Sequence, residues 1–274
     1  MSENTLVKLS TIQETMLIPL YGRAVETAKP RGVLHDPKAV EMVAAIDYDF
    51  ASLDANPHSL FACALRTAVL DEWVGVFLKE HPSGTVVEIG AGLNARFERV
   101  DNGSVHWIDL DLPDSMALRR RFFEESDRRA LVAASVLDDS WLAEVAKRPG
   151  PYFFVSEAVL VYLEEEQVRS LVRRMSERFP GARFALDTFG RTMVEFLGAR
   201  DVARRANVTM SWVCDDPAEV ERWDVGATLL ESCNLAQLPP AVSKRLPTLH
   251  RVGWGLAGGG RNRDSYKLNL FALS

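Results

Sequence analysis

The segment TVVEIGAGLNA, residues 85–95, decides the fold of this chain. It opens as a β-branched run and closes in glycines, which predicts a buried strand followed by a tight turn. Gly90, Gly92 and Ala95 have the G-x-G-x-x-G/A spacing. Glycines at these positions let a ligand approach the backbone closely at the end of a strand. The segment therefore predicts a ligand-binding loop between a strand and a helix.

Further short apolar runs follow this loop and alternate with stretches of helical periodicity. We expect the corresponding strands at 105–111, 130–136, 152–159 and 182–189. Such alternation is typical of a doubly wound, mostly parallel sheet in the α/β class. Near the end of the chain, 251–257 and 265–274 flank a glycine-rich segment. They predict a C-terminal antiparallel hairpin within this sheet.

The length of 274 residues suits one large domain with additions. Residues 1–80 are mainly helical in pattern, and we expect them to form an N-terminal cap or lid. Residues 81–274 are expected to form the core. A helix-rich insertion at about 190–250 is expected to complete the cap.

Composition and charge exclude several classes of protein. Hydrophobic residues make up 47% and charged residues 26% of the chain, as in a globular protein rather than a disordered chain or a membrane bundle. A net charge of −6 argues against nucleic acid or a membrane surface as a partner. An arginine-rich stretch at 119–129 also contains acidic residues, and we interpret it as an exposed helix face. Three scattered cysteines and the absence of a signal-peptide pattern predict a cytoplasmic protein without a metal site.

The charges around the glycine loop favour one adenosine-type cofactor. Asp109 and Asp111 lie 19 and 21 residues after Gly90, where a carboxylate binds the ribose hydroxyls in dinucleotide folds. Glu88 precedes the glycines, and a carboxylate there repels a pyrophosphate. S-Adenosylmethionine has no phosphate, and its ammonium and sulfonium groups are cationic. The pattern favours this donor, with an NAD(P)-dependent oxidoreductase, a non-catalytic adenosine-binding module and a turn without a ligand as alternatives.

Several segments resemble the leucine carboxyl methyltransferase superfamily, and within it the bacterial O-methyltransferases of tetracenomycin-type polyketide biosynthesis. These segments are IPLYGRAVE (18–26), LRTAVLDEWV (65–74), VVEIGAGLNARFERV (86–100), WIDLDLPD (107–114), SVLDDSWL (135–142) and SEAVLVYLEEEQV (156–168). The resemblance implies a class I methyltransferase fold that uses S-adenosylmethionine as its cofactor. It also implies a carboxylate or hydroxyl oxygen as the methyl acceptor.

The resemblance carries over roles by position. It implies that Arg66 holds the donor's carboxylate and that Glu157 lies near the donor's amino group. Ser135 stands where the eukaryotic members carry an aspartate near the adenine, which favours the small-molecule branch. In all, the residues predicted to bind the cofactor are Arg66, Glu88, Gly90, Ala91, Gly92, Asp109, Asp111, Leu112, Ser135, Val136 and Glu157.

For the acceptor side, the resemblance places Tyr162 toward the substrate, and His250 is the strongest candidate for a base. Because no recognised catalytic histidine motif occurs, we favour a carboxylate acceptor, which is already anionic and needs no base. Phe196, Trp212 and Trp223 in the predicted cap favour an apolar or aromatic, polyketide-like small molecule. The sequence favours neither a monomer nor a homo-oligomer.

Overall fold

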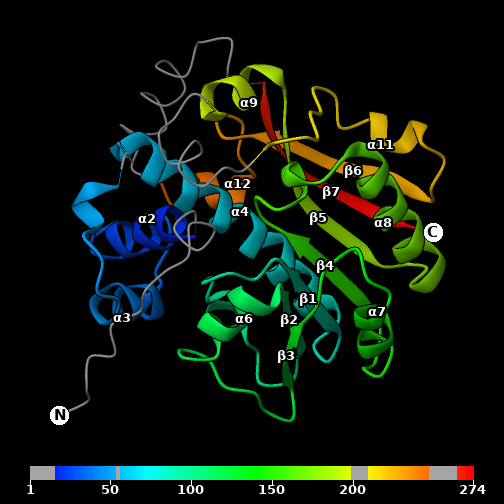
Figure 1. Cartoon of the computed structure of the whole chain (residues 1–274), viewed down its shortest axis with the longest axis horizontal. Coiled ribbons are helices and arrows are strands. Elements are labelled where there is room, and N and C mark those ends of the chain that lie inside the picture. Colours follow the sequence, from blue (N-terminus) through cyan, green and yellow to red (C-terminus); the bar gives the residue numbers. More distant parts are fainter. Residues whose placement is uncertain (1–15, 54–55, 199–208, 247–263) are drawn as a thin grey trace.

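A computed structural model describes residues 16–53, 56–198, 209–246 and 264–274. Within these residues, seven strands form one sheet in the order β3-β2-β1-β4-β5-β7-β6 (Figure 1). Neighbouring strands are parallel except that β7 is antiparallel to both β5 and β6. The strands are β1 (Thr85–Ile89), β2 (His106–Asp111), β3 (Arg129–Ala133), β4 (Tyr152–Ser156), β5 (Arg183–Phe189), β6 (Ala227–Asn234) and β7 (Tyr266–Leu273). The predicted doubly wound α/β fold is therefore confirmed.

Helices precede the first strand and follow most of the others. They are α2 (Leu17–Thr27), α3 (Pro37–Ala45), α4 (Pro57–Glu80), α5 (Arg96–Val100), α6 (Pro113–Arg119), α7 (Ser140–Val145), α8 (Glu165–Arg178), α9 (Arg191–Gly198), α11 (Glu219–Arg222) and α12 (Pro240–Ser243), with 3₁₀ turns at Phe50–Ser52 and Leu160–Tyr162. Asn56 caps α4 by accepting a hydrogen bond from the Ser59 N–H, and a proline opens the helix. No helix in the described part of the chain is long and apolar enough to cross a membrane.

The sheet is buried on both faces, which explains its continuous apolar strands. Val87 belongs to a core that includes Trp141 of α7 and Val172 of α8. Its neighbour Val86 points to the opposite face and belongs to a core with Val69 of α4. Because helices cover both faces, the central strands show no polar alternation in the sequence.

The N-terminal helices pack against two different parts of the protein, the sheet and the glycine loop. α4 packs on the sheet itself. Helices α2 and α3, at the left of Figure 1, contribute Leu20 and Met42 to a separate core with Leu93 of the loop and Leu118 of α6. Part of the segment predicted as a cap therefore packs against the glycine loop and stabilises it.

The C-terminal part corrects one prediction. The antiparallel strand expected at 265–274 is present as β7, but both of its edges are occupied, by β5 and by β6. The other expected arm of the hairpin, 251–257, lies outside the described residues. β6 falls within 190–250, which we expected to be helix-rich. As an edge strand β6 leaves several side chains exposed, so it lacks the apolar run by which the central strands were found.

Candidate active site

A cavity of about 960 Å³ lies at the carboxyl ends of β1, β2 and β4, the edge at which open α/β sheets bind ligands. Its walls come from the glycine loop, from the segments that follow β2, β3 and β4, and from α2, α4 and α9. The predicted cofactor residues that line it are Arg66, Glu88, Gly90, Ala91, Gly92, Asp111, Leu112, Ser135, Val136 and Glu157. The fold thus brings these predicted residues together around one cavity, with Asp109 as the exception.

The glycine loop has a backbone conformation that its glycines permit. Gly90 has a φ of +68° and Gly92 a φ of +47°, both in the left-handed region. A Cβ atom at residue 90 would overlap the side chain of Val159. Glycine at residue 90 therefore permits both the left-handed backbone and the close approach of Val159, which also lines the cavity.

Asp111, the last residue of β2, lines this cavity. Its Oδ2 accepts the Gly92 N–H at 2.6 Å, and its Oδ1 accepts the Leu112 N–H at 2.7 Å. Burial raises the pKa of Asp111, and these two backbone hydrogen bonds oppose the rise. The Ser115 side chain also hydrogen-bonds this carboxylate. A carboxylate has about four lone-pair positions, so Asp111 keeps acceptor capacity for a ribose hydroxyl.

Asp109 lies outside the cavity, which corrects its predicted contact with the cofactor. Its side chain is fully buried, with Oδ1 at 2.9 Å from Nη2 of Arg119 and Oδ2 at 2.8 Å from Nε of Arg129. Oδ1 also accepts the indole N–H of Trp107. Both arginines are buried, so the expected exposed helix face at 119–129 is wrong at these positions. A buried carboxylate requires such partners.

Glu157 follows β4 and uses both of its oxygens within the protein. Oε1 accepts hydrogen bonds from Nε of Arg66 at 2.7 Å and from the Thr67 hydroxyl at 2.8 Å. Oε2 accepts them from Nη2 of Arg96 at 2.7 Å and from the Asn94 amide at 3.1 Å. Burial alone would raise the pKa of Glu157, but the arginines outweigh it and hold the pKa at about 2.

Glu88 is also compensated inside the protein. Its Oε2 lies 2.7 Å from Nε of Arg96, and burial still raises its pKa. The negative charge that we read as a sign of a cationic cofactor is therefore already paired. Ion pairs continue from Arg96 through Asp71 and Arg99 to Asp36 and Arg23. Nη2 of Arg23 then donates to the Leu93 carbonyl at 2.7 Å, which ties α2 to the glycine loop.

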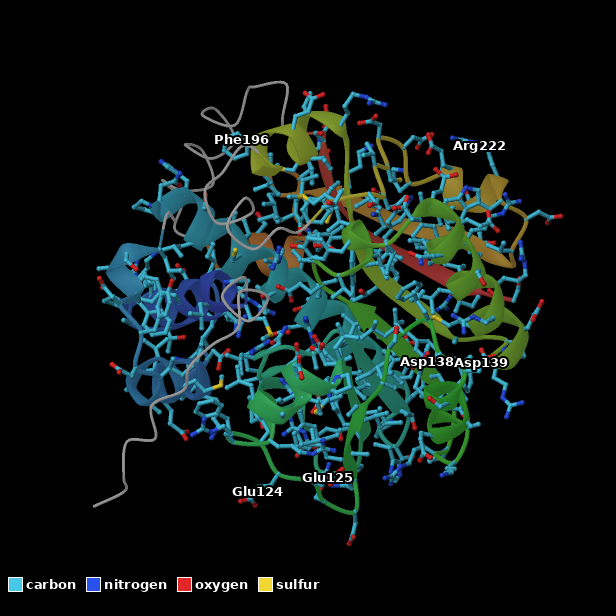
Figure 2. The ribbon with its side chains drawn as sticks, in the orientation of Figure 1. Glu124, Glu125, Asp138, Asp139, Phe196 and Arg222 are labelled. Carbon is cyan, nitrogen blue, oxygen red and sulfur yellow. The ribbon has the colours of Figure 1, made fainter. Side chains whose placement is uncertain are left out.

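The opposite end of the cavity is mostly apolar. It is lined by Val161, Phe189, Met193, Phe196, Leu197, Met210 and Leu235. Figure 2 shows Phe196 on the α9 side of the molecule, and its side chain is 49% exposed. Tyr162 also lines the cavity and is 40% exposed. His250 lies outside the described residues.

Two aromatic residues of the predicted acceptor pocket lie elsewhere. Trp212 and Trp223 pack against each other, with ring centroids 6.0 Å apart, in the core that contains α7 and α8. Neither lines the cavity. Within the described residues, the histidine that lines the cavity is His58, at the start of α4. Trp212 and Trp223 are therefore core residues, whereas Phe196 of α9 lines the cavity.

Sequence reasoning missed the polar residues that support the site. Arg96, Asn94 and Tyr266 are the main ones; Tyr266 lines the cavity and donates its hydroxyl to Asp187 at 2.8 Å. One signal was available for Arg96: a carboxylate inside a buried strand, such as Glu88, needs a cationic partner. Arg96 follows eight residues later, on α5.

Comparisons with known proteins agree with this geometry. Residues 16–176 match the family model of leucine carboxyl methyltransferases. The tetracenomycin polyketide synthesis O-methyltransferase TcmP of Streptomyces glaucescens is 30% identical over 263 residues, covering 96% of this chain and 97% of that protein. The S-adenosyl-L-methionine-dependent methyltransferase dpfgK of Gibberella zeae is 29% identical over 248 residues, covering 81% and 83%.

Among solved structures, a DUF574-family protein from Streptomyces avermitilis superposes with a TM-score of 0.61 at 18% identity. The match covers 97% of this chain and 100% of that one, and it supports the fold. The family match and the relatives agree on a methyltransferase whose cofactor is S-adenosylmethionine. This chain belongs to the leucine carboxyl methyltransferase family.

Proposed function

We propose that this enzyme methylates an oxygen atom, by preference a carboxylate, of a small apolar or aromatic molecule of the polyketide kind. The observation that carries the proposal is a single cavity with a charged, hydrogen-bonded end at the glycine loop and an apolar end at α9. The relative named for tetracenomycin polyketide synthesis supports the same substrate class.

The charged end fits S-adenosylmethionine group by group. Asp111 keeps acceptor capacity for a ribose hydroxyl beside its bonds to Gly92, Leu112 and Ser115, and Gly90 and Gly92 border the cavity without side chains. Arg66 donates Nε to Glu157, and its Nη1 lies 4.0 Å from Oδ2 of Asp187, beyond hydrogen-bond distance, so the terminal nitrogens can still donate to the donor's carboxylate. When bound, the donor supplies an electrophilic methyl group on its sulfonium. We assign Leu112, Ser135 and Val136, which border the cavity after β2 and β3, to the adenine.

The residues of this chain contribute mainly by positioning. Ion pairs among Arg66, Glu157 and Arg96 hold the donor end rigid, so the acceptor meets a fixed methyl group. Apolar residues at the other end exclude water and leave an acceptor carboxylate weakly solvated and reactive. A carboxylate is ionised at neutral pH, so no base is required. Tyr162 borders the acceptor in this proposal.

The acceptor's cover is assigned from the residues that line the cavity. We propose that helices before residue 81 and parts of 190–250 form the acceptor's cover. Met16, Ile18 and Pro19 in and before α2 line the cavity, as do residues of α9. A net charge of −6 supports an enzyme that acts on small molecules rather than on nucleic acid. The sparse, scattered cysteines support a location in the cytoplasm.

The test uses purified enzyme, methyl-labelled S-adenosylmethionine and a panel of aromatic carboxylic acids, each matched with a phenol of the same skeleton. We expect labelled methyl esters, which mild base hydrolyses to labelled methanol, whereas methyl ethers resist. We also expect a rate that is flat between about pH 6 and pH 8, because the acceptor is already ionised. Transfer to phenols alone, with a rate that rises with pH, would overturn the carboxylate assignment.

A further inference from the structure

Arg119 is a buried residue that the proposed chemistry does not use. It is the last residue of α6 and is 1% exposed. Its Nη1 lies 3.2 Å from the Ala91 carbonyl oxygen, 2.8 Å from that of Gly92 and 2.8 Å from that of Asn94. One guanidinium group therefore donates hydrogen bonds to three backbone carbonyls of the glycine loop.

The other end of the guanidinium is anchored. Nη2 of Arg119 lies 2.9 Å from Oδ1 of Asp109, and its guanidinium carbon lies 4.2 Å from the centre of the Phe123 ring. Asp109 is in turn held by Arg129 and by the Trp107 indole. Because a carboxylate and an aromatic ring hold the Arg119 guanidinium in place, its hydrogen bonds fix the position of the loop carbonyls.

Peptide geometry links this anchor to the cavity. The Ala91 carbonyl and the Gly92 N–H belong to one planar trans peptide unit, so they point in opposite directions. The carbonyl faces Arg119, and the N–H donates to Oδ2 of Asp111 at 2.6 Å. The Ala91 carbonyl also accepts the Asn94 N–H at 2.9 Å, so this peptide plane is held by Arg119 and Asn94 on one side and by Asp111 on the other.

We propose that Arg119 is a positioning residue for the cofactor: anchored by Asp109, it holds the glycine loop in the orientation in which Asp111 can bind the donor's ribose. The inference rests on the proposed function of Asp111. It gives Asp109, which we had placed in contact with the cofactor, an indirect role through Arg119.

Arg129 supplies a matched control. It is equally buried, pairs with the same Asp109, and lies 5.0 Å from the same Phe123 ring. The hydrogen-bond partners of its guanidinium group among the described residues are Asp109 and Glu98, and neither belongs to the glycine loop. Arg119→Met and Arg129→Met therefore each remove one ion pair from Asp109, but only the first frees the loop.

The experiment measures S-adenosylhomocysteine binding by calorimetry and amide hydrogen exchange of residues 90–94 in the wild type and both variants. We expect Arg119→Met to weaken binding about tenfold and to speed exchange in the loop, because loop hydrogen bonds to a charged donor are lost. We expect Arg129→Met to bind within about twofold of the wild type, despite a similar fall in melting temperature. In turnover, only Arg119→Met should raise the KM for the donor, with the KM for the acceptor unchanged.

If Arg119→Met does not fold, Arg119→Lys replaces it. Lysine keeps a charge for Asp109 but lacks the planar fork, so an intermediate loss of about threefold is expected. Equal losses in the Arg119 and Arg129 variants, or unchanged binding in the Arg119 variants, would overturn the proposal. Failure of the wild type to bind S-adenosylhomocysteine is a separate result that would overturn the proposed function itself.

Discussion

The two ends of the cavity are built by different means. At the donor end, Glu157 and Asp111 have hydrogen-bond partners on both of their oxygens, and ion pairs link this end to α2. At the acceptor end, Phe189, Met193 and Phe196 contribute apolar surface from β5 and α9. Directional bonds fix one ligand pose, whereas apolar surface with methionines adapts to several shapes. Under the proposed function, the donor is therefore specified strictly, and the acceptor is specified by size and polarity.

The largest expected effect is on stability, from the donor end. Glu157→Gln removes the nearer of the two carboxylates that compensate Arg66, the other being Asp187 at 4.0 Å, and part of the charge that compensates Arg96. Both arginines are buried. We expect the free energy of unfolding to fall by about 3 kcal/mol, since breaking a buried pair leaves an uncompensated charge. Chemical denaturation measures it. Glu166→Gln, on the exposed first turn of α8, is the control and should cost less than about 1 kcal/mol. Equal costs would show that the Glu157 pairs are dispensable.

The same carboxylate predicts a dependence of stability on pH. The pKa of Glu157 is held at about 2 in the folded protein, below its ordinary value of 4.5. Its contribution is therefore complete above about pH 4.5 and is lost as the pH falls toward 2. We expect the stability difference between the wild type and Glu157→Gln to shrink over this range in denaturation at several pH values. A difference that stays constant down to pH 2 would contradict the assigned pKa.

The next effect is on cofactor affinity. Asp111→Asn leaves one backbone N–H without its acceptor and removes a charged acceptor from the ribose site. We expect binding of S-adenosylhomocysteine to weaken by about 1–3 kcal/mol, or roughly five- to 150-fold. Calorimetry gives the affinity, and the KM for the acceptor at saturating donor should stay unchanged. An unaltered affinity would remove Asp111 from the donor site.

A smaller effect is expected at the acceptor end. Phe196→Ala removes a half-exposed ring from the cavity wall. We expect the KM for an aromatic acceptor to rise about fivefold, from loss of about 1 kcal/mol of apolar contact, with donor affinity and stability unchanged. Steady-state kinetics and calorimetry together check this. A fall in donor affinity instead would show that the two ends do not act separately.

The smallest effect is expected from Tyr162→Phe. If the acceptor is a carboxylate, the Tyr162 hydroxyl takes no proton, and kcat should change less than about fivefold. Single-turnover measurements with a saturated enzyme check this value. A much larger loss of kcat would place the hydroxyl in the chemical step.

The sequence predicted which residues line the glycine-loop end of the cavity better than which line its α9 end, for a physical reason. Gly90, Gly92 and Asp111 act through backbone conformation and short spacing, which a sequence records directly. The acceptor end is formed by α9, Met210 and Leu235, which are ordinary apolar residues brought together only by the fold. Asp109 was misplaced because spacing alone does not separate it from Asp111 two residues later. Buried partners decide between the two, and those partners are distant in sequence.

The most direct test of the central claim is calorimetric titration of the wild-type protein with S-adenosylhomocysteine and, separately, with NADH. The structure predicts one S-adenosylhomocysteine per chain and no detectable binding of NADH. Binding of NADH without binding of S-adenosylhomocysteine would contradict the assignment of the charged end to the methyl donor.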